Sequence, residues 1–373
     1  MRPRETYIGL DAVRFGAALA VAIYHLGYWW WLPDQGRPVE TAFHSAFAPI
    51  ASFARWGYVG VPIFFVLSGF IIAASASGRT WGDFLKGRAL RLYPAIWICA
   101  LPLLLAQDSD AGVAGTFLRT VVLWPFGPWL SGVLWTLAIE VIFYVLVALS
   151  LAFRVRLWTF GQTFGAVGSI YWLARAADFA TGGHAKSFFL AVELDPLGGL
   201  LLVQNCYFAV GIALWSMHAG GLTLRKLILF SIFVCAGLVS AFASGRFMIS
   251  EHGGVLLQAL NPAAIWLAAL VLTVCSIRFQ PLLWRYFSGW AVAIRTVGLA
   301  TYPLYLFHSE VGRFLMVRLS GLGPWTALAI AMSAVVLASF IVVALERWPR
   351  SMLRALLHGP PRREEATVTS DLP

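Results

Sequence analysis

The sequence predicts an all-α membrane protein that crosses the bilayer several times, and two observations carry that prediction. Hydrophobic residues make up 60% of the 373-residue chain and charged residues only 12%, with a mean hydropathy of +0.78. A soluble domain of average composition is nearer to about half apolar and about a quarter charged. Apolar windows of about twenty residues, the length at which a helix spans a bilayer, also recur along the chain. Most of the chain therefore needs an apolar solvent outside itself.

About ten such windows occur, and an even number of spans places both termini on one side of the membrane. The windows cover residues 8–30, 58–77, 92–106, 132–152, 157–177, 196–217, 227–243, 255–276, 296–317 and 325–345. About two thirds of the Lys and Arg residues fall on the side of the N-terminus, which predicts that both termini are cytoplasmic. We expect a membrane domain over residues 1–348 and a cytoplasmic tail over 349–373, disordered at its end.

Charge and cysteine usage exclude several functions. The formal net charge of +10 is distributed between the apolar windows, so we expect no nucleic-acid partner. The four cysteines lie inside apolar stretches without metal-ligand spacing, so neither a disulfide framework nor a metal is expected. The motifs GxSxG, HExxH, GxGxxG and the phosphate-binding GxxxxGKS are absent. We therefore expect any chemistry to depend on histidine and carboxylate side chains in a partly dry site.

The first window, Tyr7 to Trp31, carries two basic residues, Arg14 and His25, on one helical face. A helix turns by about 100° per residue, so eleven residues bring both side chains to the same side, about 16 Å apart along the axis. Such a polar stripe inside a membrane indicates a passage or an elongated site. The alternative is a structural one, in which Arg14 pairs with Asp11 and His25 lies at the interface.

A basic cluster lies in the stretch from Gly78 to Trp97, which we expect on a cytoplasmic loop. Arg88 and Arg91 are one helical turn apart, so both guanidinium groups can bind one polyanion from the same side. A cofactor that carries phosphate is the functional interpretation. Ordinary anchoring by positive charge on the cytoplasmic side is the alternative.

The stretch WTLAIEVIFYVLVAL places a carboxylate, Glu140, inside an apolar window, with Tyr144 one turn later. A carboxylate there must be paired, hydrogen-bonded or protonated. Glu140 could orient a histidine, polarise a donor or neutralise an arginine. The alternative is a buried structural glutamate that bonds another span.

A last polar cluster lies in TYPLYLFHSEVGRF, which begins at Thr301. Tyr302 and Tyr305 are one turn apart, and His308 and Glu310 follow them towards the outer half of the window. A face lined by tyrosine can bind a sugar or another hydroxylated group. Interfacial aromatic residues beside a solvated histidine are the alternative.

Together these stretches resemble the integral-membrane acyltransferase 3 family, which includes O-antigen, exopolysaccharide and Nod-factor O-acetyltransferases. The resemblance covers nearly the whole chain and depends on six segments in order: LDAVRFGAALAVAIYH, GYVGVPIFFVLSGFII, RALRLYPAIW, WTLAIEVIFY, LATYPLYLFH and ALERWPR. The chain departs from the family pattern at Thr136 and Thr301, where serine is common. It also has Val141 and Ile142 where a polar or second acidic residue often follows the glutamate.

The resemblance implies that residues 1–348 form a membrane O-acyltransferase domain in a cell inner membrane. Such a domain takes an acyl group, usually acetyl, from cytoplasmic acyl-CoA and delivers it to a hydroxyl of a cell-envelope or exported glycan. The acceptor would be an exopolysaccharide, a lipopolysaccharide or another lipid-linked saccharide. Acylation of a small molecule such as a macrolide is one alternative. A transporter of lipid or glycan that catalyses no reaction is another.

The resemblance also implies roles for the residues singled out above. His25 would be the general base, or would carry the acyl group transiently, with Arg14 and Glu140 in support. Acetyl-CoA or another acyl-CoA is the expected donor, without a metal. The residues expected to hold coenzyme A are Arg88, Arg91 and Tyr93, and those expected to contact the acceptor are Tyr144, Tyr302, Tyr305 and His308.

Overall fold

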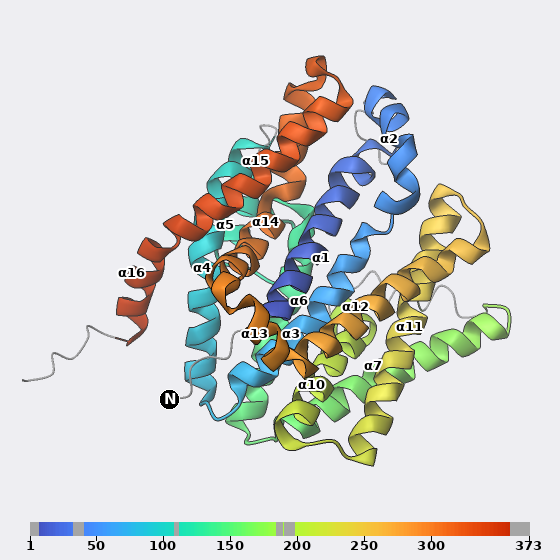
Figure 1. The fold of residues 1–373 in the computed structure, drawn as a ribbon, viewed down its shortest axis with the longest axis vertical. Coiled ribbons are helices and arrows are strands. Elements are labelled where there is room, and N and C mark those ends of the chain that lie inside the picture. The colour runs from blue at the N-terminus through green and yellow to red at the C-terminus, as the bar shows by residue number, and fades with distance from the viewer. Residues whose placement is uncertain (1–6, 33–40, 108–111, 184–188, 190–197, 359–373) are drawn as a thin grey trace, which may run out of the picture.

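The computed structural model describes residues 7–32, 41–107, 112–183, 189 and 198–358, and every regular element within them is a helix (Figure 1). Seven helices in this part of the chain are long and apolar enough to cross a membrane. They are α1 (Ile8–Gly27), α3 (Gly60–Ala76), α4 (Trp81–Leu105), α6 (Trp135–Ala152), α11 (Leu224–His252), α12 (Asn261–Arg278) and α15 (Pro324–Leu345). The protein is therefore a multi-pass membrane protein, all-helical over the residues described.

The remaining apolar windows are helical as well, although they do not reach the same length and hydropathy. They correspond to α7 (Leu157–Ala180), to a π-helical segment (Gly199–Gln204) that continues into α10 (Asn205–Gly220), and to α14 (Ala291–Arg318). Helix α10 has only 16 residues, and α14 includes several ionisable side chains. The count of ten spans and the cytoplasmic position of both termini remain predictions.

Helix α4 begins earlier than the sequence suggested. The Thr80 hydroxyl accepts a hydrogen bond of 3.1 Å from the backbone N–H of Asp83, so it caps the helix, and the acidic Asp83 lies in the first turn. The segment from Trp81 onwards, expected to be a cytoplasmic loop, is therefore helical. Arg88 and Arg91 lowered its hydropathy and concealed the first turns of a long helix.

The segment expected to be a tail also begins as a helix. Helix α16 (Arg347–His358) follows α15 and packs against α4 (Figure 1). Residues 359–373, the part expected to be disordered, lie outside the described residues. Three short helices occupy connections between the long ones: α2 (Thr41–Ala54), α5 (Val113–Val121) and α13 (Gln280–Phe287).

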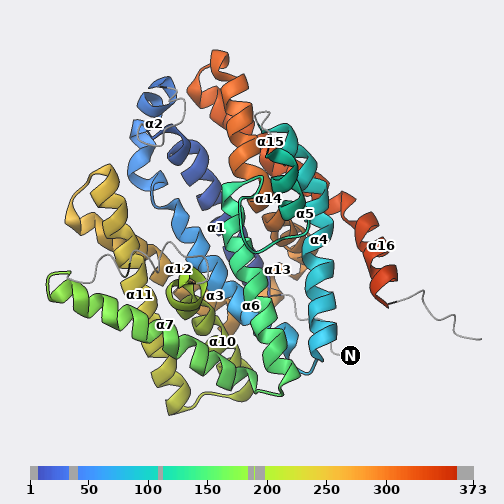
Figure 2. The same ribbon diagram turned by 180° about the vertical axis from the view of Figure 1, so that it is seen from behind.

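Helix α1 lies in the middle of the bundle and packs against α3, α12 and α14 (Figure 1). Seen from the opposite face, α6 stands in front of it and α4 lies beside α6, with α7 and α10 below (Figure 2). Small residues allow close approach of the helix backbones. A Cβ atom added at Gly69 of α3 would fall on the carbonyl oxygen of Phe208, and one at Gly211 of α10 on that of Val66.

Candidate active site

A cavity of about 1100 Å³ lies among α1, α3, α4, α6, α10, α14 and α16. Its described lining is strongly cationic, because it contains many arginine side chains and few carboxylates. The arginines are Arg14, Arg79, Arg88, Arg91, Arg295, Arg350 and Arg354, and the carboxylates are Asp11 and Glu140. A cavity of this charge inside a membrane protein favours a ligand with several negative charges.

Arg14 lies in the wall of this cavity and shares one buried carboxylate with a second arginine. Its Nη1 atom is 3.8 Å from Oδ1 of Asp11, while Nη1 of Arg295 is 3.3 Å from Oδ2 of the same residue. The clamp between Arg14 and Asp11 is therefore present. One carboxylate facing two guanidinium groups nevertheless leaves a positive charge directed at the cavity.

Arg88 and Arg91 project from α4 into the cavity and lie over aromatic rings. The guanidinium carbon of Arg88 is 5.6 Å from the ring centre of Phe84 and 5.7 Å from that of Tyr144. That of Arg91 is 5.7 Å from the ring centre of Tyr302. Within the described chain neither arginine forms an ion pair, and the buried Nε atom of Arg88 has no hydrogen-bond partner. Both charges are thus positioned to bind an anion.

Glu140 also lines the cavity, and its carboxylate is held by two neutral donors. Its Oε1 atom accepts hydrogen bonds of 3.0 Å from Ser68 Oγ and 2.7 Å from the Tyr144 hydroxyl. The bonds to Ser68 and Tyr144 are the hydrogen bonds of Glu140 within the described residues. They hold its carboxylate in the wall of the cavity. The side chain that the structure brings to His25 is a different one.

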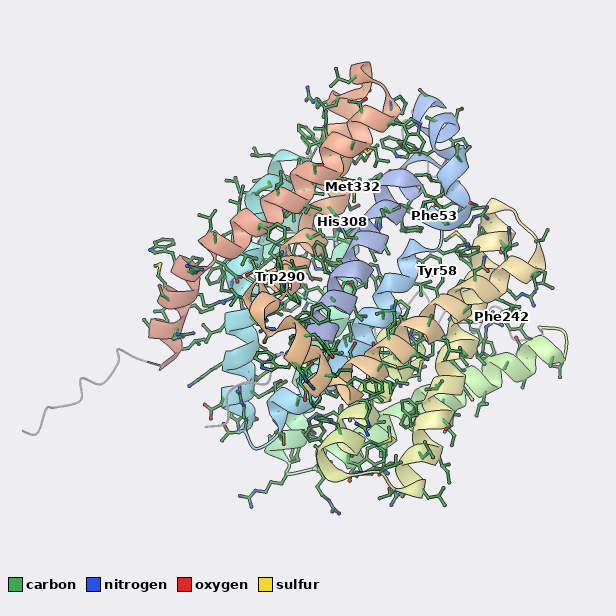
Figure 3. The ribbon with its side chains drawn as sticks, viewed as in Figure 1. Phe53, Tyr58, Phe242, Trp290, His308 and Met332 are labelled. Atoms are coloured by element: carbon green, nitrogen blue, oxygen red, sulfur yellow. The ribbon has the colours of Figure 1, made fainter. Side chains whose placement is uncertain are left out.

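That side chain is His308 of α14, which is fully buried where α14 packs against α1 (Figure 3). Its Nε2 atom lies 3.2 Å from Nδ1 of His25, and the two ring centres are 5.0 Å apart. The family resemblance implies a contact of His308 with the acceptor, and it does not predict this pair. Single-helix periodicity cannot show which side chains of different helices meet, so the sequence offered no signal for it.

Tyr305 stands between the cavity and the histidine pair. It lines the cavity, and its ring centre is 5.6 Å from that of His308. Its hydroxyl shares a hydrogen bond of 2.7 Å with Thr136 Oγ1 and lies 3.3 Å from the Val133 carbonyl oxygen. The cavity thus reaches one aromatic layer short of the two imidazole rings.

The other predicted tyrosines differ in position. Tyr302 lines the cavity below Arg91 and donates a hydrogen bond of 3.3 Å to the Leu92 carbonyl. Tyr93, expected to hold coenzyme A, is absent from the described lining, and its hydroxyl donates 3.1 Å to the carbonyl of Val122, just after α5. Tyr93 is thereby placed at the contact of α4 with the end of α5.

Several cavity residues were not singled out from the sequence. Ser68 and His218 gave no signal beyond an ordinary polar residue in or beside an apolar window, and Arg295 counted only towards the cytoplasmic charge. Arg350 and Arg354 fall in the segment expected to be a tail. A charge at the end of a span is common in any membrane protein, so its position in a cavity could only come from the packing.

A model of the family described as an acyltransferase domain matches residues 7–344 of this chain. The matched segment contains both histidines and the arginines of α1, α4 and α14. No curated protein and no solved structure matches the chain.

Proposed function

The chain belongs to the acyltransferase 3 family, and from this premise we propose that it transfers an acetyl group from cytoplasmic acetyl-CoA to a hydroxyl of a cell-envelope or exported glycan. The membrane acyltransferase activity follows from the family, and the donor and acceptor are the proposal. The observation that carries it is the excess of arginine over carboxylate in the cavity wall. Coenzyme A presents a diphosphate and a further phosphate, which suit such a site.

Arg88 and Arg91 are the best candidates to bind the diphosphate. They come from one helix face, they lack carboxylate partners among the described residues, and the buried Nε of Arg88 has no hydrogen-bond acceptor. A bound phosphate oxygen would supply that acceptor. Arg350 and Arg354 of α16 line the same cavity and would bind the remaining phosphate.

The thioester arm would extend from these arginines along α1, past Arg14, towards Tyr305 and the histidine pair. Arg14 and His25 lie on one helix face about 16 Å apart, the length scale of an extended pantetheine arm. Tyr305 lines the cavity and packs against His308, so the acyl group would approach the histidine pair at that point, with the Tyr305 ring between the described cavity and the imidazoles. Tyr305 therefore adjoins both the arm and the acceptor.

In this proposal His25 acts as general base towards the acceptor hydroxyl. The oxygen attacks the thioester carbonyl, the C–S bond breaks, and the proton passes to the leaving sulfur. Arg14 lies along the route, too far from His25 to contact the tetrahedral intermediate, and would help to neutralise the diphosphate. Transfer through an acyl-histidine is the competing mechanism, in which His25 attacks the thioester carbon as a nucleophile and coenzyme A leaves. The acceptor hydroxyl then takes the acyl group from His25, and its proton ends on the CoA thiol.

The test uses inverted inner-membrane vesicles that contain the chain and acetyl-CoA labelled in the acetyl group. We expect label to enter the glycan or lipid-linked saccharide fraction with release of free CoA thiol. Vesicles with His25→Ala at equal protein amount should show neither. Label in a small extractable metabolite would instead identify a small-molecule acceptor. Lipid movement without thioester consumption would contradict the proposal and identify a transporter.

A further inference from the structure

The hydrogen-bond partners of His308 determine which of its nitrogens carries the hydrogen. Its Nδ1 atom lies 3.1 Å from the carbonyl oxygen of Leu304 and 3.0 Å from that of Tyr305. Carbonyl oxygens only accept hydrogen bonds, so Nδ1 must be the N–H of the ring. A neutral His308 therefore presents Nε2 as an acceptor, and this atom faces His25.

The same reasoning determines the state of His25. Its Nδ1 atom lies 3.0 Å from the Val21 carbonyl oxygen and 3.2 Å from Nε2 of His308. Both partners are acceptors, so Nδ1 of His25 carries the hydrogen and directs it to them. The lone pair of the neutral His25 ring is then at Nε2, the atom that would take a proton from a substrate.

We propose that His308 is the positioning residue of His25: its Nε2 lone pair fixes the His25 ring with Nε2 as the basic atom and stabilises the imidazolium that forms there. This inference rests on the proposed function for its kinetic part only. Other histidine bases are supported in this way by a carboxylate. Here a neutral imidazole takes that position, while the Glu140 carboxylate is held by Ser68 and Tyr144.

The step balances without any further reactant. The acceptor hydroxyl gives its proton to Nε2 of His25 as its oxygen bonds the thioester carbon. The C–S bond then breaks, and the Nε2 proton passes to the thiolate, so an ester and free CoA thiol leave a neutral His25. The hydrogen on Nδ1 stays in place throughout and points to His308, whose acceptor strengthens the contact while His25 is positively charged.

Two amide variants separate acceptor chemistry from packing. In His308→Asn the short amide reaches the position of Nδ1 and can still bond the Leu304 and Tyr305 carbonyls, but it places no acceptor near His25. In His308→Gln the longer side chain brings an amide oxygen to the position of Nε2. We expect kcat to fall at least about tenfold in His308→Asn and to stay within about fivefold of wild type in His308→Gln.

The Michaelis constant for acetyl-CoA gives a second reading. His308 is not among the described residues that line the cavity, so KM should stay within about twofold in both variants. His44→Gln, which changes an exposed histidine on α2, is the matched control and should leave kcat and KM unchanged. Equal kcat in the Asn and Gln variants, or a Gln variant as inactive as His25→Ala, would overturn the proposal.

Chemical modification of His25 tests its contact with His308 without an assay of acyl transfer. Diethylpyrocarbonate modifies the basic nitrogen of neutral histidine, and the modified His25 peptide can be quantified by mass spectrometry. We expect the modification rate of His25 to fall severalfold in His308→Asn and to be largely restored in His308→Gln. Absence of acetyl transfer by the wild type would end the proposed function alone. Identical modification rates in both variants would end the inference alone.

Discussion

Arg88 and Arg91 carry positive charge without an ion-pair partner in the described chain, whereas three other arginines of the cavity wall have one. Arg14 and Arg295 both face Asp11, and Arg350 forms an ion pair of 2.6 Å with the buried Glu346. A guanidinium group with no partner is costly in a membrane domain, and the three aromatic rings beneath these arginines offset only part of that cost. Their unpaired state is accounted for if an anionic ligand binds there.

This predicts that Arg88→Met and Arg91→Met each weaken the binding of coenzyme A by about tenfold or more, since a hydrogen bond to a charged group contributes about 1.5–3 kcal/mol. Methionine preserves most of the apolar stem. Titration calorimetry on the purified protein measures the dissociation constant. Arg318→Met, an exposed arginine at the far end of α14, is the control. Unchanged affinity in both α4 variants would remove coenzyme A from this part of the cavity.

A substitution at Glu140 should change the affinity for coenzyme A in the opposite direction. Glutamine in its place keeps an oxygen that accepts from Ser68 and Tyr144, but it removes one of the two negative charges in the described cavity wall. Glu140→Gln should therefore tighten coenzyme A binding by about threefold to tenfold, with the gain decreasing at high salt. Glu310→Gln, outside the described lining, should not change it. Weaker binding in Glu140→Gln would mean that the carboxylate itself organises the arginines.

At the scale of helices, the contact between α1 and α14 determines where the two imidazoles meet. Two glycines of α14, Gly298 before His308 in the chain and Gly312 after it, allow the two helices to approach each other closely. A Cβ atom at Gly298 would fall about on the Asp11 carboxylate, and one at Gly312 would lie 2.7 Å from a methyl carbon of Leu26. Leu26 is fully buried and follows His25 directly, so it cannot easily move aside.

Gly312→Ala should consequently push α14 away from α1 next to the histidine pair. We expect kcat for acetyl transfer to fall about tenfold, because the contact between His25 and His308 lengthens, and the unfolding temperature to drop by several degrees. The affinity for coenzyme A should remain, since the arginines proposed to bind it come from α4 and α16. Gly82→Ala, a helix position with open space around it, is the control. Full activity in Gly312→Ala would show that the pair tolerates a wider spacing.

The elements themselves were largely predictable, because an apolar run of about twenty residues has few alternatives to a helix in a bilayer. Where the structure describes them, all ten windows fall on helical segments. Several boundaries were misplaced, among them the end of α11, and the largest difference, at the start of α4, has one cause. Window hydropathy assigns a stretch such as Lys86 to Arg91 to a loop, whereas a helix can extend through it when its charged side chains face a polar cavity. The helix over residues 347–358 was missed for a similar reason, because its sequence is basic and partly polar.

The site was predictable to the extent that ionisable residues inside apolar windows had to face the interior of the bundle. In the structure Arg14, Glu140 and Tyr144 line one cavity together with Tyr302 and Tyr305, and the roles expected for them stay predictions. The rule could not assign partners, because a partner depends on the rotation and depth of two helices relative to each other. The hydrogen bond between Ser68 and Glu140 and the contact between the two histidines both depend on such helix rotation and depth.

For the whole molecule, the cavity has two chemically different ends. Arg79 follows α3, Arg350 and Arg354 lie on α16, and Tyr7 precedes α1, so this end lies on the side where both termini are predicted. The Tyr305 end adjoins the histidine pair, beyond which Trp30 Nε1 donates 2.9 Å to Ser309 Oγ. A phosphate-bearing donor and a hydroxylated acceptor would then approach His25 from opposite directions.

This arrangement predicts strict sidedness of the donor. Acetyl-CoA crosses membranes poorly because of its phosphates, so only vesicles that expose the cytoplasmic face should use it when it is added outside. We expect at least about tenfold more label transfer in inverted vesicles than in right-side-out vesicles of equal protein content, and detergent should abolish the difference. Arg350→Met should reduce transfer in inverted vesicles by raising KM, because its guanidinium group lines the cavity at the end where the donor enters. Greater transfer in right-side-out than in inverted vesicles would place the mouth of the cavity on the other side of the membrane. The predicted orientation of both termini would then be wrong, since the arginines of α16 are fixed to the C-terminal end of the chain.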